Sequence, residues 1–133
     1  MLSRTFKKIA NWLNQKRKER AEALMFERKV VVRFDDIYIS STYPDGTVQS
    51  ISWHEINCVA IETNDSGPWG ADIWWLLEGL DKRCTYPQGA TGDREALGKY
   101  QKRLPEFRDR AVIEAMGCTS NARFICWERR PAA

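Results

Sequence analysis

The sequence has few of the features that most readily identify a membrane protein or a metalloprotein. Its longest apolar run, residues 73–77, is far shorter than the roughly 20 residues that span a bilayer, so we expect no transmembrane helix. A single histidine, His54, and four cysteines without a CxxC spacing give no zinc-knuckle or redox motif. We therefore expect no metal site, no cofactor, and reduced, mostly buried cysteines.

Two further absences concern nucleotides and secretion. The eight glycines form neither a GxGxxG nor a GxxxxGK motif after an expected strand, so no phosphate-binding loop is predicted. The N-terminus has basic residues but neither a continuous apolar segment nor a small-residue cleavage site, and it does not resemble a signal peptide. These observations favour a cytoplasmic protein.

Charge is divided into blocks that the small net charge of +3 conceals. Residues 1–34 contain ten basic and three acidic side chains, and residues 82–133 contain eleven basic and six acidic ones. Between them, residues 35–81 contain nine acidic side chains and no lysine or arginine. Because this acidic segment repels phosphates, we do not expect the body of the protein to bind nucleic acid.

Residues 1–28 are predicted to form a basic amphipathic helix in front of the folded domain. Leu2, Phe6, Ile9 and Leu13 recur at helical spacing, and basic side chains lie outside this stripe. Helices that dock on their own domain or on a partner protein share this pattern with membrane-surface helices and nucleic-acid-binding arms. Docking is the favoured interpretation, and contact with a membrane surface through residues 1–27 is the second.

Residues 29–130 are predicted to form a single α+β domain. Apolar alternation and short connections predict a mainly antiparallel, twisted sheet of about six or seven strands, because parallel crossovers need longer connections. Residues 44–46, Pro-Asp-Gly, are typical of a hairpin turn whose glycine has a positive φ. Trp74 and Trp75 are adjacent in a strand and must point to opposite faces, so at least one is expected in the core.

Two helices are predicted between this sheet and a last strand near residues 124–127. Asp93 is a suitable N-cap for the first of them, and Pro105 is expected to end it. Gly117 follows the second helix, where a residue in the left-handed conformation is expected.

Candidates for catalysis are few. His54 and Glu55 could supply a general base near Cys58, but neighbouring residues of a strand point to opposite faces, and nothing in the sequence places these side chains together. Asp35 and Asp36 lack the alternating acids of a calcium loop and favour a turn. We therefore predict that the protein is not an enzyme.

The acidic segment also contains four of the six tryptophans. Acidic side chains around aromatic ones suit a basic partner protein, since charge steers association and aromatic residues anchor it. The alternative is a solvated acidic surface over an aromatic core. Trp69, in a Gly-Pro-Trp-Gly loop, is the favoured anchor. The candidate partner-binding residues are Tyr43, Asp45, Glu62, Asp65, Trp69 and Asp72.

Seven short stretches between residues 30 and 128 carry a resemblance to known proteins. They are residues 51–56 (ISWHEI), 59–63 (VAIET), 65–68 (DSGP), 72–79 (DIWWLLEG), 104–107 (LPEF), 111–117 (AVIEAMG) and 124–127 (FICW). The pattern resembles a group of small bacterial α+β proteins that includes immunity proteins of polymorphic toxin systems, among them Rhs-type systems. Residues 1–28 lie outside the pattern.

The resemblance implies a protein that binds a cognate antibacterial toxin in the cytoplasm and neutralises it without catalysis. Such a protein covers the toxin's active site or a nearby surface. An acidic, aromatic surface would complement a toxin that is basic near its site. The alternative function is that of a membrane-peripheral adaptor whose basic N-terminal helix lies on lipid.

Overall fold

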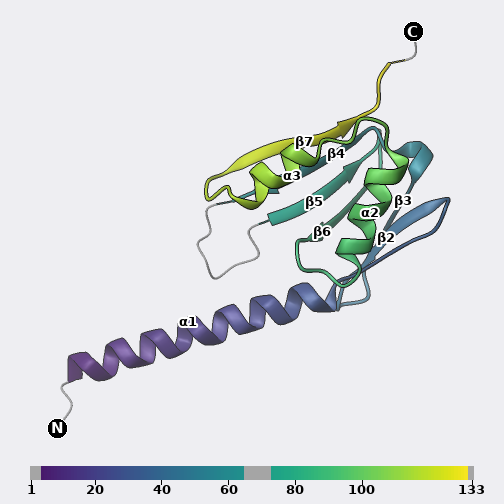
Figure 1. Ribbon diagram of the computed structural model, residues 1–133. Coiled ribbons are helices and arrows are strands. Elements are labelled where there is room, and N and C mark those ends of the chain that lie inside the picture. Colours follow the sequence, from purple (N-terminus) through teal and green to yellow (C-terminus); the bar gives the residue numbers. More distant parts are fainter. Residues whose placement is uncertain (1–3, 65–72, 132–133) are drawn as a thin grey trace.

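The computed structural model describes residues 4–64 and 73–131, which form a long N-terminal helix and a folded body (Figure 1). Helix α1 comprises Arg4–Lys29. The strands of the body are β1 (Val31–Phe34), β2 (Tyr38–Thr42), β3 (Val48–Ser52), β4 (Cys58–Thr63), β5 (Ile73–Glu78), β6 (Arg83–Pro87) and β7 (Ala122–Glu128). Its helices are the 3-10 helix η1 (Trp53–Glu55), α2 (Asp93–Arg103) and α3 (Asp109–Met116).

The strands form two antiparallel sheets with the orders β1-β2-β3 and β6-β5-β4-β7. The predicted α+β class is confirmed, with the strands divided between two sheets. Side chains join the sheets where β3 approaches β6. The Gln49 side-chain oxygen accepts hydrogen bonds from the Thr85 backbone N–H (2.7 Å) and hydroxyl (2.9 Å). Buried residues of both sheets belong to one hydrophobic core.

Aromatic side chains fill the centre of that core, on the side of the four-stranded sheet where α2 and α3 lie (Figure 1). The Tyr100 ring centroid lies 5.6 Å from that of Trp75 and 5.9 Å from that of Trp53. The hydroxyl groups of Tyr86 and Tyr100 are 2.5 Å apart, so each satisfies the other inside the core. Trp75 is buried and Trp74 is half-buried, which confirms that the pair contributes at least one residue to the core.

Two of the three described glycines with a positive φ adopt it for different reasons. Gly46 has a φ of 89° in the β2–β3 turn, as predicted, and nothing lies within 4 Å of a Cβ built there. Gly92 has a φ of 93°, and a Cβ there would lie 2.3 Å from the Val32 carbonyl oxygen. Gly92 is the N-cap of α2, so the prediction that Asp93 caps this helix is wrong. Asp93 begins the helix, and its carboxylate accepts a hydrogen bond from the Gly89 N–H instead (2.9 Å).

The end of α3 also differs from the prediction. Gly117 has a φ of −94° and is not left-handed. The Cys118 N–H donates to the Ala115 carbonyl (3.2 Å), so the helix closes with a tighter 3-10-type turn that needs no positive φ.

Helix α1 projects away from the body and meets it at its C-terminal end (Figure 1). The Thr91 hydroxyl donates to the Arg28 carbonyl (2.6 Å), and the Phe26 ring contacts the Tyr43 ring at a centroid distance of 6.5 Å. In the described residues α1 does not pack along the domain, and docking of the helix on a partner protein stays a prediction. None of the helices in the described residues is long and apolar enough to cross a membrane.

Candidate functional site

The four-stranded sheet has one face that carries neither α2 nor α3, and we call it the outer face. Strand alternation turns Val59 and Ile61 of β4 into the core. Glu62 therefore points outward, and its direct neighbours are Trp74 of β5 and Arg123 of β7. By the same registers, the outer face consists of Cys58, Ala60, Glu62, Trp74, Leu76, Glu78, Arg83, Thr85, Pro87, Arg123, Ile125 and Glu128.

Arg123 is the centre of an ion-pair network on the outer face. Its Nη1 lies 2.9 Å from a carboxylate oxygen of Glu62, and its Nη2 contacts the carboxylate of Glu78. The same Nη2 lies 3.9 Å from the Cys58 sulfur. The hydrogen bond to Glu78, followed by that to Glu62, raises the pKa of Arg123 above its ordinary value, while desolvation acts in the opposite direction. The guanidinium is therefore a permanent cation that joins three strands.

A cleft of about 180 Å³ lies beside this network. It is lined by Glu62, Thr63, Asn64, Trp74, Leu76, Arg83 and Thr85. Asn64, which directly follows β4, and Trp74, the second residue of β5, both line the cleft. The cleft thus combines a half-buried indole with one acidic and one basic side chain. Such a combination suits a partner that offers an apolar group together with polar ones.

The structure places three of the six predicted binding residues and brings one of them into the cleft, Glu62. The Tyr43 hydroxyl donates to the Thr85 carbonyl (2.6 Å), and burial raises the pKa of Tyr43 above its ordinary value. Asp45 is exposed and accepts a hydrogen bond from the Thr47 N–H (2.9 Å), which lowers its pKa. Both residues thus have structural contacts and are not among those that line the cleft. Asp65, Trp69 and Asp72 lie outside the described residues.

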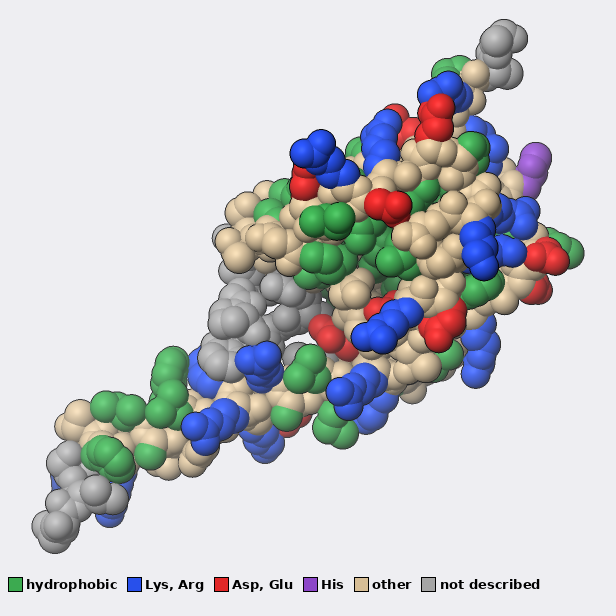
Figure 2. All heavy atoms as spheres, viewed as in Figure 1, with side chains coloured by type: hydrophobic (Ala, Val, Ile, Leu, Met, Phe, Trp, Pro, Cys, Tyr) green, Lys and Arg blue, Asp and Glu red, His purple; other side chains and the backbone are tan. Residues whose placement is uncertain are grey.

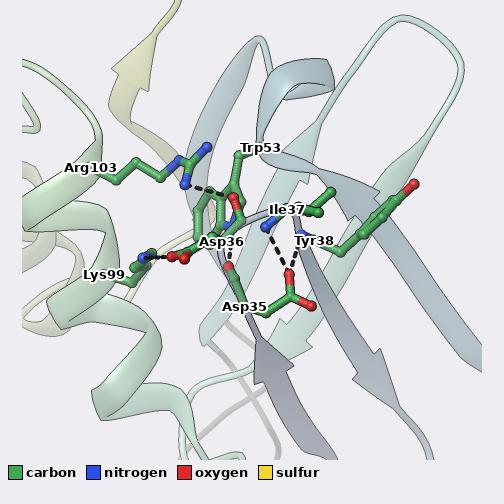
Figure 3. Close-up of polar contacts among 7 residues, drawn as sticks. All are labelled: Asp35, Asp36, Ile37, Tyr38, Trp53, Lys99 and Arg103. Atoms are coloured by element: carbon green, nitrogen blue, oxygen red, sulfur yellow. Dashed lines mark hydrogen bonds and ion pairs between the residues drawn. The ribbon is translucent and has the colours of Figure 1, made fainter.

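Acidic residues outside the cleft also have basic partners. The Lys99 ammonium lies 3.0 Å from the Asp36 carboxylate, and an Arg103 nitrogen donates to the Asp36 carbonyl (2.8 Å) (Figure 3). The Lys82 ammonium lies 3.3 Å from the Glu55 carboxylate. The bases all come from residues 82–133. The predicted acidic surface is therefore partly neutralised by the C-terminal basic block.

The Asp35–Asp36 turn is confirmed. The Asp35 carboxylate accepts hydrogen bonds from the N–H groups of Ile37 (2.8 Å) and Tyr38 (2.7 Å), and its carbonyl accepts one from the Trp53 indole (2.8 Å) (Figure 3). The bond from Tyr38, followed by that from Ile37, lowers the Asp35 pKa. Among the described residues, no group of three or more His, Cys, Asp or Glu side chains is placed to hold a metal ion.

His54 and Cys58 occupy different surfaces. His54 is exposed on η1 and lines a separate cleft beside Glu55 and Lys82. Cys58 lies on the outer face, where burial raises its pKa above the ordinary value. A base on η1 and a weakly acidic thiol on β4 are therefore not arranged as an activated nucleophile.

The four cysteines are all unpaired, and their environments predict different reactivity. Hydrogen bonds from Ser120 and Thr63 lower the pKa of Cys118, whereas burial raises the pKa of Cys126 to about 12. We expect iodoacetamide at mildly alkaline pH to alkylate Cys118 first and Cys126 at least about a hundredfold more slowly, because the thiolate is the reactive form. Peptide mass spectrometry over time measures both rates. Cys58 reacting as fast as Cys118 would contradict this assignment.

Sequence reasoning missed two basic residues of the site, Arg83 and Arg123. A local signal existed for Arg83, because a tight turn after Glu78 places these two residues opposite each other in the β5–β6 hairpin. Arg123 pairs with Glu62 only because β7 returns to β4 across the whole helical segment. No periodicity or spacing indicates that pairing.

Three kinds of comparison bear on the identity of the chain. The chain matches no protein-family model, no curated protein and no solved structure in these comparisons.

Proposed function

We propose that the protein binds another protein through the outer face of its four-stranded sheet, and that this partner is a cognate antibacterial toxin. The observation that carries the proposal is the cleft that Trp74 lines together with Glu62 and Arg83. Half-buried aromatic residues beside charged ones are typical anchors of protein interfaces. The resemblance to immunity proteins of polymorphic toxin systems supports the choice of a toxin. In this role the protein acts in the cytoplasm and neutralises the toxin by covering its active site or a nearby surface.

The charges of the site further define which partner surface is expected to fit it. Glu62 and Glu78 share Arg123, so these two acids offer less negative charge than their sequence context suggests. Asp65 and Asp72, in the sequence between β4 and β5, stay predicted candidates for contact with a basic partner. The expected partner surface is therefore one with an apolar group surrounded by basic and hydrogen-bonding side chains.

The test uses the full chain and the product of the gene immediately upstream. We expect the two proteins to co-purify, and we expect Trp74→Ala to weaken the affinity at least about thirtyfold, as for a central aromatic anchor. Charge reversal of Asp65 and Asp72 to lysine should slow association most strongly at low salt. Isothermal titration calorimetry and stopped-flow association measure these effects.

Leu80→Asp and Asp81→Lys are the matched controls, since both residues are exposed in the β5–β6 turn at the other end of β5. Both variants should bind like the original protein. An upstream product that is not a toxin, or equal losses in the control and cleft variants, would refute the proposal.

A further inference from the structure

The N-terminal half of α1 presents an apolar stripe outside the folded body. Phe6, Ile9, Trp12 and Leu13 are 43–57% exposed. At about 100° per residue these side chains lie within about 120° of the helix circumference. Figure 2 shows hydrophobic and basic side chains next to each other along the projecting helix. An apolar patch of this kind on a projecting element marks an interaction surface.

The remaining sides of the same turns are basic. Residues 4–18 contain no Asp or Glu, and their basic side chains are Arg4, Lys7, Lys8, Lys16, Arg17 and Lys18. Arg4 and Lys7 lie away from the apolar stripe, and Lys8 lies at its border, one turn before Trp12. The Lys16 ammonium lies 6.0 Å from the Trp12 ring centroid, one turn along the helix. Lysine and arginine stems reach from an apolar layer to a charged one, so basic residues at the border of the stripe are compatible with its burial.

Hydrogen bonds fix the C-terminal end of α1, which we call its base, to the body, whereas the amphipathic N-terminal half projects away from it (Figure 1). The Thr91 carbonyl accepts a hydrogen bond from the Val32 N–H (2.8 Å), and the Thr91 N–H donates one to the Val30 carbonyl (2.9 Å). The Thr91 hydroxyl also donates to the Arg28 carbonyl. The 26 residues of α1 span about 39 Å at about 1.5 Å per residue. The amphipathic end can therefore contact an extended surface without displacing the domain.

The sequence of α1 discriminates between three possible binding partners of this stripe, namely a second copy of the chain, nucleic acid and a lipid surface. In a coiled coil with a second copy, the heptad positions that continue Phe6, Ile9 and Leu13 would fall on Lys16 and Arg20, which oppose a dimer seam. Nucleic acid would use the basic side chains and leave the apolar stripe in water. An anionic lipid surface uses both, because headgroups attract the cations while the acyl boundary takes up the apolar side chains.

We propose that residues 4–14 of α1 bind an anionic membrane surface, with Phe6, Ile9, Trp12 and Leu13 inserted at the acyl boundary. The helix lies in the interface and does not cross the bilayer. This interaction would place the domain at the membrane surface, and it does not depend on the identity of the partner at the outer face.

The experiment is co-sedimentation of the full chain with vesicles. We expect binding to vesicles of equimolar phosphatidylglycerol and phosphatidylcholine, at least about tenfold weaker binding to phosphatidylcholine alone, and weaker binding at high salt. The double variant Ile9→Gln and Leu13→Gln removes apolar area without introducing charge and should lower the partition coefficient about a hundredfold. Leu80→Gln is the matched control, since Leu80 is 96% exposed on the body, and it should change nothing.

Other outcomes would overturn the proposal. Circular dichroism of each variant verifies that α1 is still helical, so that lost binding is not lost structure. Equal sedimentation of the double variant and the original chain would refute insertion of the stripe. Retention of RNA without vesicle binding would assign the helix to nucleic acid, and a dimer that the double variant dissociates would assign it to self-association. Each of these results leaves the toxin-binding test unaffected.

Discussion

Replacing Trp75 with alanine is expected to lower the free energy of unfolding by about 3–5 kcal/mol, the range for truncating a large buried aromatic residue. Trp75 is 2% exposed, and its ring stacks on Tyr86 at a centroid distance of 6.2 Å. Its indole N–H also donates to the Gln88 side-chain oxygen (2.7 Å). The substitution would leave a cavity beside Tyr86 and Tyr100 and remove the donor that satisfies Gln88.

Trp74→Ala is the matched control because it removes the same side chain from the neighbouring position. Trp74 is half-buried on the outer face, so we expect a loss of at most about 2 kcal/mol. For partner binding we expect the opposite order, with the larger loss of affinity for Trp74→Ala, because Trp74 lies in the proposed interface. Urea unfolding followed by far-ultraviolet circular dichroism measures stability without relying on the removed fluorophore. Similar losses for the two variants would mean that the faces of β5 are assigned incorrectly.

The adjacent tryptophans illustrate what the sequence predicts and what it leaves open. Strand alternation requires that they point to opposite faces, and in the structure they do so. Which of the two is buried depends on where α2 places Tyr100 and on which face of the sheet the helices cover. Those choices are made by contacts between segments far apart in the chain, and no local pattern records them.

Element types were predictable because each has a local cause. The turn at Gly46 and the helix that ends before Pro105 follow from backbone preferences of single residues. The caps of α2 and α3 were not predictable in this way. Asp93 and Gly117 are residue types that often cap helices, but here their segments form other local hydrogen bonds than those of a cap. The division into two sheets also escaped prediction, since side-chain contacts of Gln49 and Thr85 form the seam.

The candidate site was only partly predictable from charge. Three sequence blocks of alternating sign suggested an acidic surface, with the N-terminal helix as the nearest source of compensation. In the folded body, Lys82, Lys99 and Arg123 of the third block pair with acids of the second. Each of these ion pairs is partly exposed and contributes little to stability. Their consequence is electrostatic, because they reduce the net negative charge of the body.

Replacing Gly92 with alanine is the second substitution with a large expected effect. A non-glycine residue at a φ of 93° is strained, and its Cβ would lie 2.3 Å from the Val32 carbonyl oxygen. Relief requires β1 to move away from residue 91, which weakens the Val32–Thr91 and Thr91–Val30 hydrogen bonds. Together these costs lower the free energy of unfolding by about 3 kcal/mol.

Gly46→Ala separates the two contributions. Gly46 has almost the same φ, 89°, but nothing lies within 4 Å of a Cβ there, so only backbone strain of about 1 kcal/mol is expected. Chemical denaturation of both variants measures the difference. Thr91 also holds the Arg28 carbonyl, so Gly92→Ala, unlike Gly46→Ala, should speed proteolysis after Lys29 by loosening the base of α1. Equal destabilisation would show that φ alone matters, and unchanged proteolysis would show that residue 91 does not fix the helix to the body.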